Sequence, residues 1–577
     1  MRNEKGIILA TVMIMVVLIM IITTAGLKMS ELGYQAYGSE KKYQMAGWAA
    51  EYALNTGVDY VVSSQSCPAT TTGNLTYSGL TVPYTYSSAS GGNYCMIHAT
   101  GSFGGAKVVK FAVVPKLSSS YGALTLRNGG NLTVSGSSAV VNCSATCKTP
   151  GVVFGGSLSQ NISGAYTTTS CPNNPKGIYG EPTAVQDGQG NECATLNGTC
   201  TGTTLSDRIP EIFDSTDLSD LKNDLSKTYN GFSVDVANLS VSGMPSITSA
   251  PSPSCVCTNT GTFTLSSGTT SCTGVADFSA CGGQIKFSAA NVQINGIPSN
   301  ISTIVAAGNI TNGSVTATTG NFSNKSFYAL GSSSITFNDR DITLNNTNVV
   351  AGGGITLSNF DTAINSTKIV SEGSSGVTIS GGNSISNTAI VSTSASGNIS
   401  LGGSSYTNST VVSKNTLTIS GSADTITDSY IFTNTLYLEK NSGGMAGGIL
   451  YAQGNATTQS PWAGNVDLGT DSKPILFFVG GNFLMDHGTG SADIHGLLFV
   501  NGTANMGATG NFDIKGAVVA NASSGTNTFS MTGNPQITFE PTILSALSTS
   551  LNGLVKSPTC SGSGQGLYLS NNKVTIY

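Results

Sequence analysis

The sequence predicts a mainly β chain of the α+β class, with one long N-terminal helix, a small antiparallel sheet and a large parallel β-solenoid (β-helix). Three observations lead to this prediction. Residues 7–27 form an apolar run without a charged side chain. Only 9% of the residues are charged and 72 are glycine, which suits short strands and polar turns. From residue 349 onward, short apolar segments recur about every 20 residues, as in stacked β coils.

The charge and cysteine content narrow the functional classes. A net charge of -5 gives no overall field that would attract nucleic acid, so no nucleic-acid partner is expected. The twelve cysteines all follow the apolar run, which favours disulfides in an oxidising compartment. Structural zinc is the alternative, but Cys143-x3-Cys147 and Cys255-x-Cys257 are not repeated CxxC pairs. No cofactor is expected.

The N-terminal region begins with a charged leader, residues 1–6, which ends in Gly6. Residues 7–60 contain no proline and predict one continuous helix, apolar at first and amphipathic from Lys28. An ordinary secretory signal has its cleavage site after the apolar core, whereas here the glycine precedes it. A plain signal anchor that carries an extracellular domain is the alternative interpretation.

This order of leader, glycine and apolar run resembles the class III signal of type IV prepilins. Residues 44–54, QMAGWAAEYAL, resemble the corresponding region of PilX-type minor pilins. The resemblance implies cleavage by a prepilin peptidase between Gly6 and Ile7. It also implies partners: other pilins, the inner-membrane pilus assembly machinery, and the membrane itself before assembly.

The same resemblance suggests which residues serve filament assembly, namely Thr11, Ala49, Ala50 and Glu51. Major pilins generally have glutamate at the fifth mature position, which is Thr11 here. The chain is therefore expected to be a minor subunit and not the repeating one.

Residues 61–116 predict a small pilin-like sheet. Four strand-like runs are separated by Gly and Ser turns: 75–77, 80–86, 94–99 and 106–114. The last two resemble the closing hairpin of small pilin sheets. Cys67 and Cys95 are the disulfide candidates, because a bridge between them would tie the end of the helix to this sheet.

Residues 117–281 predict the start of the solenoid, interrupted by a Cys-rich insertion from Pro150. Within the insertion, residues 206–227 have leucines at helical spacing. The acidic residues of this segment are expected to form the solvated face of a helix, with a metal-binding surface as the alternative.

Residues 282–541 predict a parallel β-solenoid. Apolar pairs begin at intervals of 20, 21, 21 and 20 residues: Val349/Val350, Ile369/Val370, Ile390/Val391, Val411/Val412 and Ile431/Phe432. Each pair is followed by a β-type triplet such as Ile355-Thr356-Leu357. A single apolar residue then recurs at Ile364, Ile385, Tyr406 and Ile426, each with a small polar residue two positions later. One period thus predicts three short strands and three corners, with the small polar residues in tight turns.

Further coils are expected along the chain at Ile304/Val305, Ala329/Leu330, Ile449/Leu450, Phe478/Val479, Phe499/Val500 and Val518/Val519. Residues 542–577 predict a C-terminal cap, with a helix at 542–551 over the open end of the stack. The segments around the last coils resemble the C-terminal portion of PilX-family proteins.

Residues able to perform catalysis are sparse, so no catalytic residue is expected. Asp339-Arg340-Asp341 is interpreted as a strand with both aspartates on one face, where an ion pair explains them as well as acid–base chemistry does. Asp486, His487, Asp493 and His495 surround a Gly-rich turn. They are weak candidates for a metal site, with a hydrated loop as the alternative.

These features predict a type IV pilus-associated minor pilin that supports pilus assembly and displays a solenoid for binding or adhesion. The chain is expected in the inner membrane as a single-pass protein before assembly, and afterwards in an extracellular pilus, at or near its tip. A surface glycan or protein is the expected ligand of the solenoid. The alternatives are a minor pseudopilin of a type II secretion system and a membrane-anchored β-helix enzyme acting on polysaccharide.

Overall fold

The computed structural model describes residues 4–64, 67–90, 94–115, 122–127, 130–142, 151–167, 185–187, 198–201, 218–316, 318–359, 363–381, 384–420, 425–439, 444–460, 466–487, 492–521 and 528–556. It confirms the predicted fold class, with a long helix, a small antiparallel sheet and a large parallel β-solenoid. Two compact units divide the chain, one containing residues 1–118 and the other residues 119–560.

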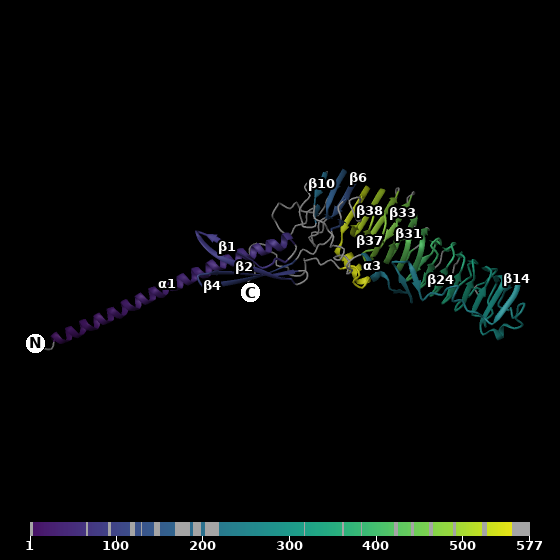
Figure 1. Ribbon diagram of the computed structural model, residues 1–577, viewed down its shortest axis with the longest axis horizontal. Coiled ribbons are helices and arrows are strands. Elements are labelled where there is room, and N and C mark those ends of the chain that lie inside the picture. The colour runs from purple at the N-terminus through teal and green to yellow at the C-terminus, as the bar shows by residue number, and fades with distance from the viewer. Residues whose placement is uncertain are drawn as a thin grey trace. The chain divides into compact units, whose positions relative to one another are not determined.

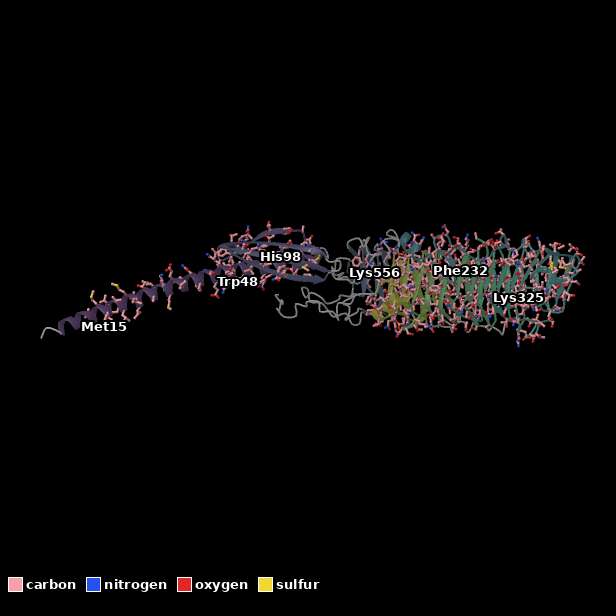
Figure 2. All side chains as sticks on the ribbon, turned by 90° about the horizontal axis from the view of Figure 1, so that it is seen from below. Met15, Trp48, His98, Phe232, Lys325 and Lys556 are labelled. Atoms are coloured by element: carbon pink, nitrogen blue, oxygen red, sulfur yellow. A yellow bond between two sulfur atoms is a disulfide. The ribbon has the colours of Figure 1, made fainter. Side chains whose placement is uncertain are left out.

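The first unit consists of helix α1 (Glu4–Ser64) and a four-stranded sheet. At about 1.5 Å per residue, α1 is about 90 Å long. The sheet is antiparallel in the order β1-β2-β3-β4, and its strands contain the four predicted runs: β1 (Thr71–Tyr77), β2 (Leu80–Ser90), β3 (Tyr94–Phe103) and β4 (Ala106–Pro115). In Figure 2, Met15 lies on the part of α1 that is clear of the sheet, and Trp48 lies beside the sheet.

The second unit is a solenoid whose strands stack on one another along its length (Figure 1). The parallel strand pairings divide it into three rows, so the solenoid is three-sided. The row that we call the covered row contains β16 (Thr303–Ala306), β18 (Ser326–Ala329), β21 (Asn348–Ala351), β24 (Lys368–Ser371), β27 (Ala389–Ser392), β35 (Ile475–Val479), β5 (Leu124–Leu126), β7 (Val152–Phe154) and β9 (Val185–Asp187). The open row contains β17 (Ile310–Asn312), β19 (Ile335–Asn338), β22 (Ile355–Ser358), β25 (Val377–Ser380), β28 (Ile399–Gly402), β33 (Ala456–Ser460) and β36 (Phe483–His487). The third row contains β20 (Leu344–Asn345), β23 (Ile364–Asn365), β26 (Ser384–Ser386), β29 (Ser405–Thr407) and β34 (Val466–Leu468).

Longer strands turn a corner and belong to more than one row. They are β14 (Cys255–Leu265), β15 (Gln284–Ile294), β30 (Thr410–Ser420), β31 (Ile426–Glu439), β32 (Met445–Ala452), β37 (Ala492–Val500), β38 (Ala504–Ala520), β39 (Thr528–Phe539), β6 (Gly130–Asn142) and β8 (Ser157–Thr167). The core is the space between the three rows, filled by inward apolar side chains such as Phe327 and Phe337, whose ring centroids are 5.2 Å apart.

The predicted repeat is confirmed in register from residue 349 to residue 438. Val349, Ile369, Ile390, Val411 and Ile431 pair successively with one another, and the triplets and single apolar residues do the same. The small polar residues predicted for tight turns have positive φ, as at Ser366 (50°), Asn387 (50°) and Asn408 (45°). Asn and Asp adopt this left-handed conformation more easily than most residues, so the same corner can repeat in every coil.

Outside this central segment, the predicted positions of several coils are wrong by one or two residues. Ile304 pairs with Phe327, so the apolar pair is Phe327/Tyr328 and not Ala329/Leu330. Leu450, Phe477 and Leu498 occupy the first position of later coils, one residue before or after the predicted ones. The cause is that these strands are apolar throughout, so periodicity alone does not fix their register.

The coils do not stack in the order of the chain. The last two described strands of the chain, β38 and β39, pair with β5 and β6 near its beginning. The first coils therefore extend the stack beyond the last ones. The opposite end of the stack is β14 (Figure 1). Two disulfides, Cys255–Cys281 and Cys257–Cys272, link β14 to the residues that follow it. The η1 turn (Phe278–Cys281) lies between β14 and β15. At the end formed by the first coils, β10 (Gly198–Thr201) pairs antiparallel with β8.

This order corrects the prediction for the C-terminal cap. Helix α4 (Pro541–Ser550) packs against β32, β37 and β38, which belong to different coils, and therefore lies along the side of the stack. It does not cover an open end, because β39 is already paired with β6. Residues 557–577 of the predicted cap lie outside the described residues.

The Cys-rich segment is also more than an insertion. Its described C-terminal part, residues 218–254, runs along the covered row and leads into β14 at one end of the stack. It contains α3 (Leu218–Leu225), β11 (Thr228–Tyr229), β12 (Phe232–Asp235) and β13 (Ser240–Ser242). The helix predicted at 206–227 is thus described only as α3, and its first twelve residues lie outside the described residues.

Contacts at several coils locate this cover segment, residues 218–254. Asn230 donates a hydrogen bond to the carbonyl oxygen of Asn408 (2.8 Å), and Gln453 donates one to that of Ala237 (2.7 Å). Farther along, the backbone N–H of Ile247 donates to Oε1 of Glu372 (2.8 Å). The cover segment therefore lies against several coils before the chain continues into β14.

Candidate functional site

The first candidate surface is the free half of α1. The described large apolar side chains from Val12 to Met29 are between 45% and 75% exposed. An apolar surface of this length has no counterpart on ordinary soluble monomers and requires lipid or protein around it. By length and composition α1 can cross a membrane. Gly6, Ile7 and Thr11 lie within α1, but their side chains are outside the described part of the structure.

The other half of α1 is held by the small sheet. Ala49 and Ala50 are buried, and Gly101 of β3 approaches them so closely that an added Cβ would collide with the carbonyl oxygen of Ala46 and the backbone nitrogen of Ala50. The small residues of the AGWAA segment thus let helix and sheet come into direct backbone contact. Ala49 and Ala50 face the sheet of their own chain, so any role in filament assembly would act through the position of that sheet.

An ion pair and a disulfide also join α1 to the small sheet. Nζ of Lys110 lies 2.8 Å from Oε2 of Glu51, and the Glu51 side chain remains half exposed. Cys67, just beyond the helix, is bonded to Cys95 of β3, which is the pair named from the sequence. The sheet is therefore tied to the helix by an ion pair within the contact and by a disulfide just beyond the end of α1.

The second candidate surface is the outer face of the open row, which we call the open face. Inward residues such as Ile355 and Leu357 are buried, whereas Thr356 between them is partly exposed. The outward side chains stack in register over eight coils: Thr311, Thr336, Thr356, Thr378, Ser400, Thr418, Tyr437 and Thr457. Tyr437 is 41% exposed. The sequence signal for this ladder is the central residue of each triplet.

The four weak metal candidates are divided between two strands that belong to different rows. Asp486 and His487 are in β36 of the open row, while Asp493 and His495 are in β37 of the third row. Among the described residues, no group of three His, Cys, Asp or Glu side chains could hold a metal ion. The side chain of His487 is not described, and that of Asp486 is exposed.

Asp493 instead belongs to an acidic row. It pairs in register with Asp467 of one neighbouring coil and Asp513 of the other. Burial raises the pKa of Asp467 and of Asp513, and the charge of Asp493 raises both further. Nearby, Nδ1 of His495 lies 2.7 Å from Oδ1 of Asp471, and Nζ of Lys515 lies 3.8 Å from Oδ2 of Asp513. These basic groups offset the carboxylate repulsion.

The strand predicted at Asp339-Arg340-Asp341 is wrong. These residues form a turn after β19, and the backbone N–H of Asp341 donates a hydrogen bond to Oδ1 of Asp339 (3.1 Å). Because the carboxylate of Asp339 closes the turn, the two aspartates do not alternate along a strand.

Comparison of the chain with family models, with curated proteins and with solved structures gives no match.

Proposed function

We propose that this chain is a type IV pilus-associated minor pilin, anchored by α1 in the inner membrane before assembly and carrying the solenoid as a binding or adhesion domain. The observation that carries the proposal is the division of α1 into two halves. One half exposes apolar side chains on all sides, and the other packs against a four-stranded antiparallel sheet.

This division suits a subunit that moves from lipid into a filament. In a bilayer the exposed apolar half is surrounded by lipid tails, and in a filament it would be surrounded by the helices of other pilins. The sheet, fixed to the helix by Gly101 and by the Cys67–Cys95 bridge, gives neighbouring subunits a rigid surface. The solenoid is far larger than this sheet, so a place at or near the filament tip avoids crowding along the shaft.

The test is the N-terminus of the mature protein, measured by mass spectrometry of protein purified from producing cells. Cleavage after Gly6 removes six residues and leaves Ile7 first. Gly6→Val should block this cleavage and retain the leader. Gly26→Val is the matched control, because a Cβ at Gly26 meets nothing within 4 Å and should leave cleavage unchanged.

A mature protein that begins elsewhere, or a Gly6→Val variant that is still cut after residue 6, would contradict the proposal. Immunogold labelling then tests the location. Label on surface fibres, concentrated at their ends, is expected for a tip-located pilin. Label confined to the periplasm would instead favour the pseudopilin of a secretion system.

A further inference from the structure

At the corners of the solenoid, stacked polar side chains make hydrogen bonds with the protein itself. At one corner, the buried hydroxyl of Ser429 accepts a hydrogen bond from the backbone N–H of Ser409 (3.0 Å) and donates one to the carbonyl oxygen of Thr427 (2.9 Å). At the next corner, the buried hydroxyl of Ser371 donates to the carbonyl oxygen of Gly353 (2.7 Å). These hydroxyls satisfy backbone groups that the turns leave unpaired.

The ladder on the open face differs. Its eight outward hydroxyls, from Thr311 to Thr457, make no hydrogen bond with any other described residue. Each hydroxyl can donate one hydrogen bond and accept others. The open face thus keeps a continuous row of donors and acceptors available to a molecule outside the protein.

The shape and charge of this row restrict what can bind it. Seven steps of about 4.8 Å make the row about 34 Å long. None of the eight outward side chains is charged, and Tyr437 adds an exposed aromatic ring. A nucleic acid or an acidic polymer needs basic side chains, and a lipid surface needs a contiguous apolar patch, so neither fits this row.

We propose that the open face binds a neutral polysaccharide, with the sugar chain lying along the ladder. Sugar hydroxyls both donate and accept, as the Thr and Ser hydroxyls do, and the aromatic ring of Tyr437 can stack on the apolar face of a sugar ring. A long polymer can contact many coils at once, so weak single contacts add up. This inference rests on the proposed function only for the display of the solenoid outside the cell.

The test uses the full chain purified in detergent and retained on insoluble cellulose, chitin or xylan, with polygalacturonate as the acidic comparison. The variant Thr378→Glu/Ser400→Glu places two charges in the middle of the ladder. The control Ser374→Glu/Ala395→Glu adds the same charges at exposed loop positions of the same two coils. Thermal melting of both variants shows whether the fold is retained.

Wild type and control should be retained on at least one neutral polysaccharide, with the ladder variant at least tenfold weaker and Tyr437→Ala several-fold weaker. Retention on polygalacturonate alone, retention on none of these polymers, or equal binding by the ladder variant would overturn the inference. Cleavage after Gly6 and fibre labelling do not depend on this outcome, so they test the proposed function separately.

Discussion

The covered row and the open row of the solenoid have the same strand spacing and the same stacking, but opposite outer surfaces. In the covered row, Val349 and Val350 are adjacent and both fully buried. In the open row, Ile355 and Leu357 are buried and Thr356 between them is not. Since neighbouring side chains of a strand point to opposite faces, the apolar pair requires cover on the outside and the alternating triplet does not.

The cover comes from two segments of the same chain. The ring of Tyr229 in the cover segment lies 5.1 Å from that of Phe432, on the outer face of the covered row. At later coils, the rings of Tyr451, Phe478 and Phe499 stack on one another 4.9 and 5.0 Å apart, in the region where α4 packs. A repeated apolar pair in this solenoid therefore indicates a covered face, and a repeated single Thr indicates a free one.

Adding a charge should give the largest difference in unfolding free energy between the covered row and the open row. Val391 is buried on the outer side of the covered row, so Val391→Asp should lower the free energy of unfolding by about 3–5 kcal/mol, because the carboxylate is buried without a partner. Thr378→Asp on the open face should change it by less than about 0.5 kcal/mol. Urea unfolding of the detergent-purified chain measures both, and equal effects would refute the assignment of the two faces.

Removing a hydroxyl should give a smaller difference in unfolding free energy between a buried corner and the open face. Ser429→Ala leaves the buried backbone N–H of Ser409 without an acceptor and should cost about 1–3 kcal/mol. The matched change Ser400→Ala removes a hydroxyl without a partner among the described residues and should cost less than about 0.5 kcal/mol. The same unfolding measurement applies, and a cost at Ser400 as large as at Ser429 would show that the open-face hydroxyls are already engaged.

The smallest effect on stability is expected in the third row of strands, which carries Asp467, Asp493 and Asp513 in register. Burial raises the pKa of Asp513 above its ordinary value of 3.8, and Asp493 adds to the rise while Lys515 opposes it. The folded state therefore binds this proton more tightly than the unfolded state, and stability decreases as pH rises from 3.8 through the raised pKa.

Asp513→Asn should accordingly stabilise the chain by about 0.5 kcal/mol at pH 7, since it removes the like charge beside Asp493. The gain should disappear well below pH 3.8, where the carboxyl of Asp513 is protonated in both the folded and the unfolded state. Unfolding measured across this pH range tests the sign. A gain that increases toward low pH would contradict it.

In the first unit, the sequence predicted most of the structure. The apolar run without proline and the four strand-like runs are local signals, and each becomes the expected element. The packing of Ala49 and Ala50 against the sheet could not be predicted from the sequence. Their contact with Gly101 joins segments about fifty residues apart, and small residues alone do not reveal which backbone approaches them.

In the solenoid, the period, the three strands of each coil and the tight turns at the corners could be predicted from the sequence, because these depend on residues only a few positions apart. Tertiary structure alone decided that the first coils extend the last, that residues 218–254 cover one row and that α4 lies along the side. The coils are alike in pattern, so any of them could stack on any other. Only the complete set of long-range contacts selects one order and leaves the Thr ladder uncovered.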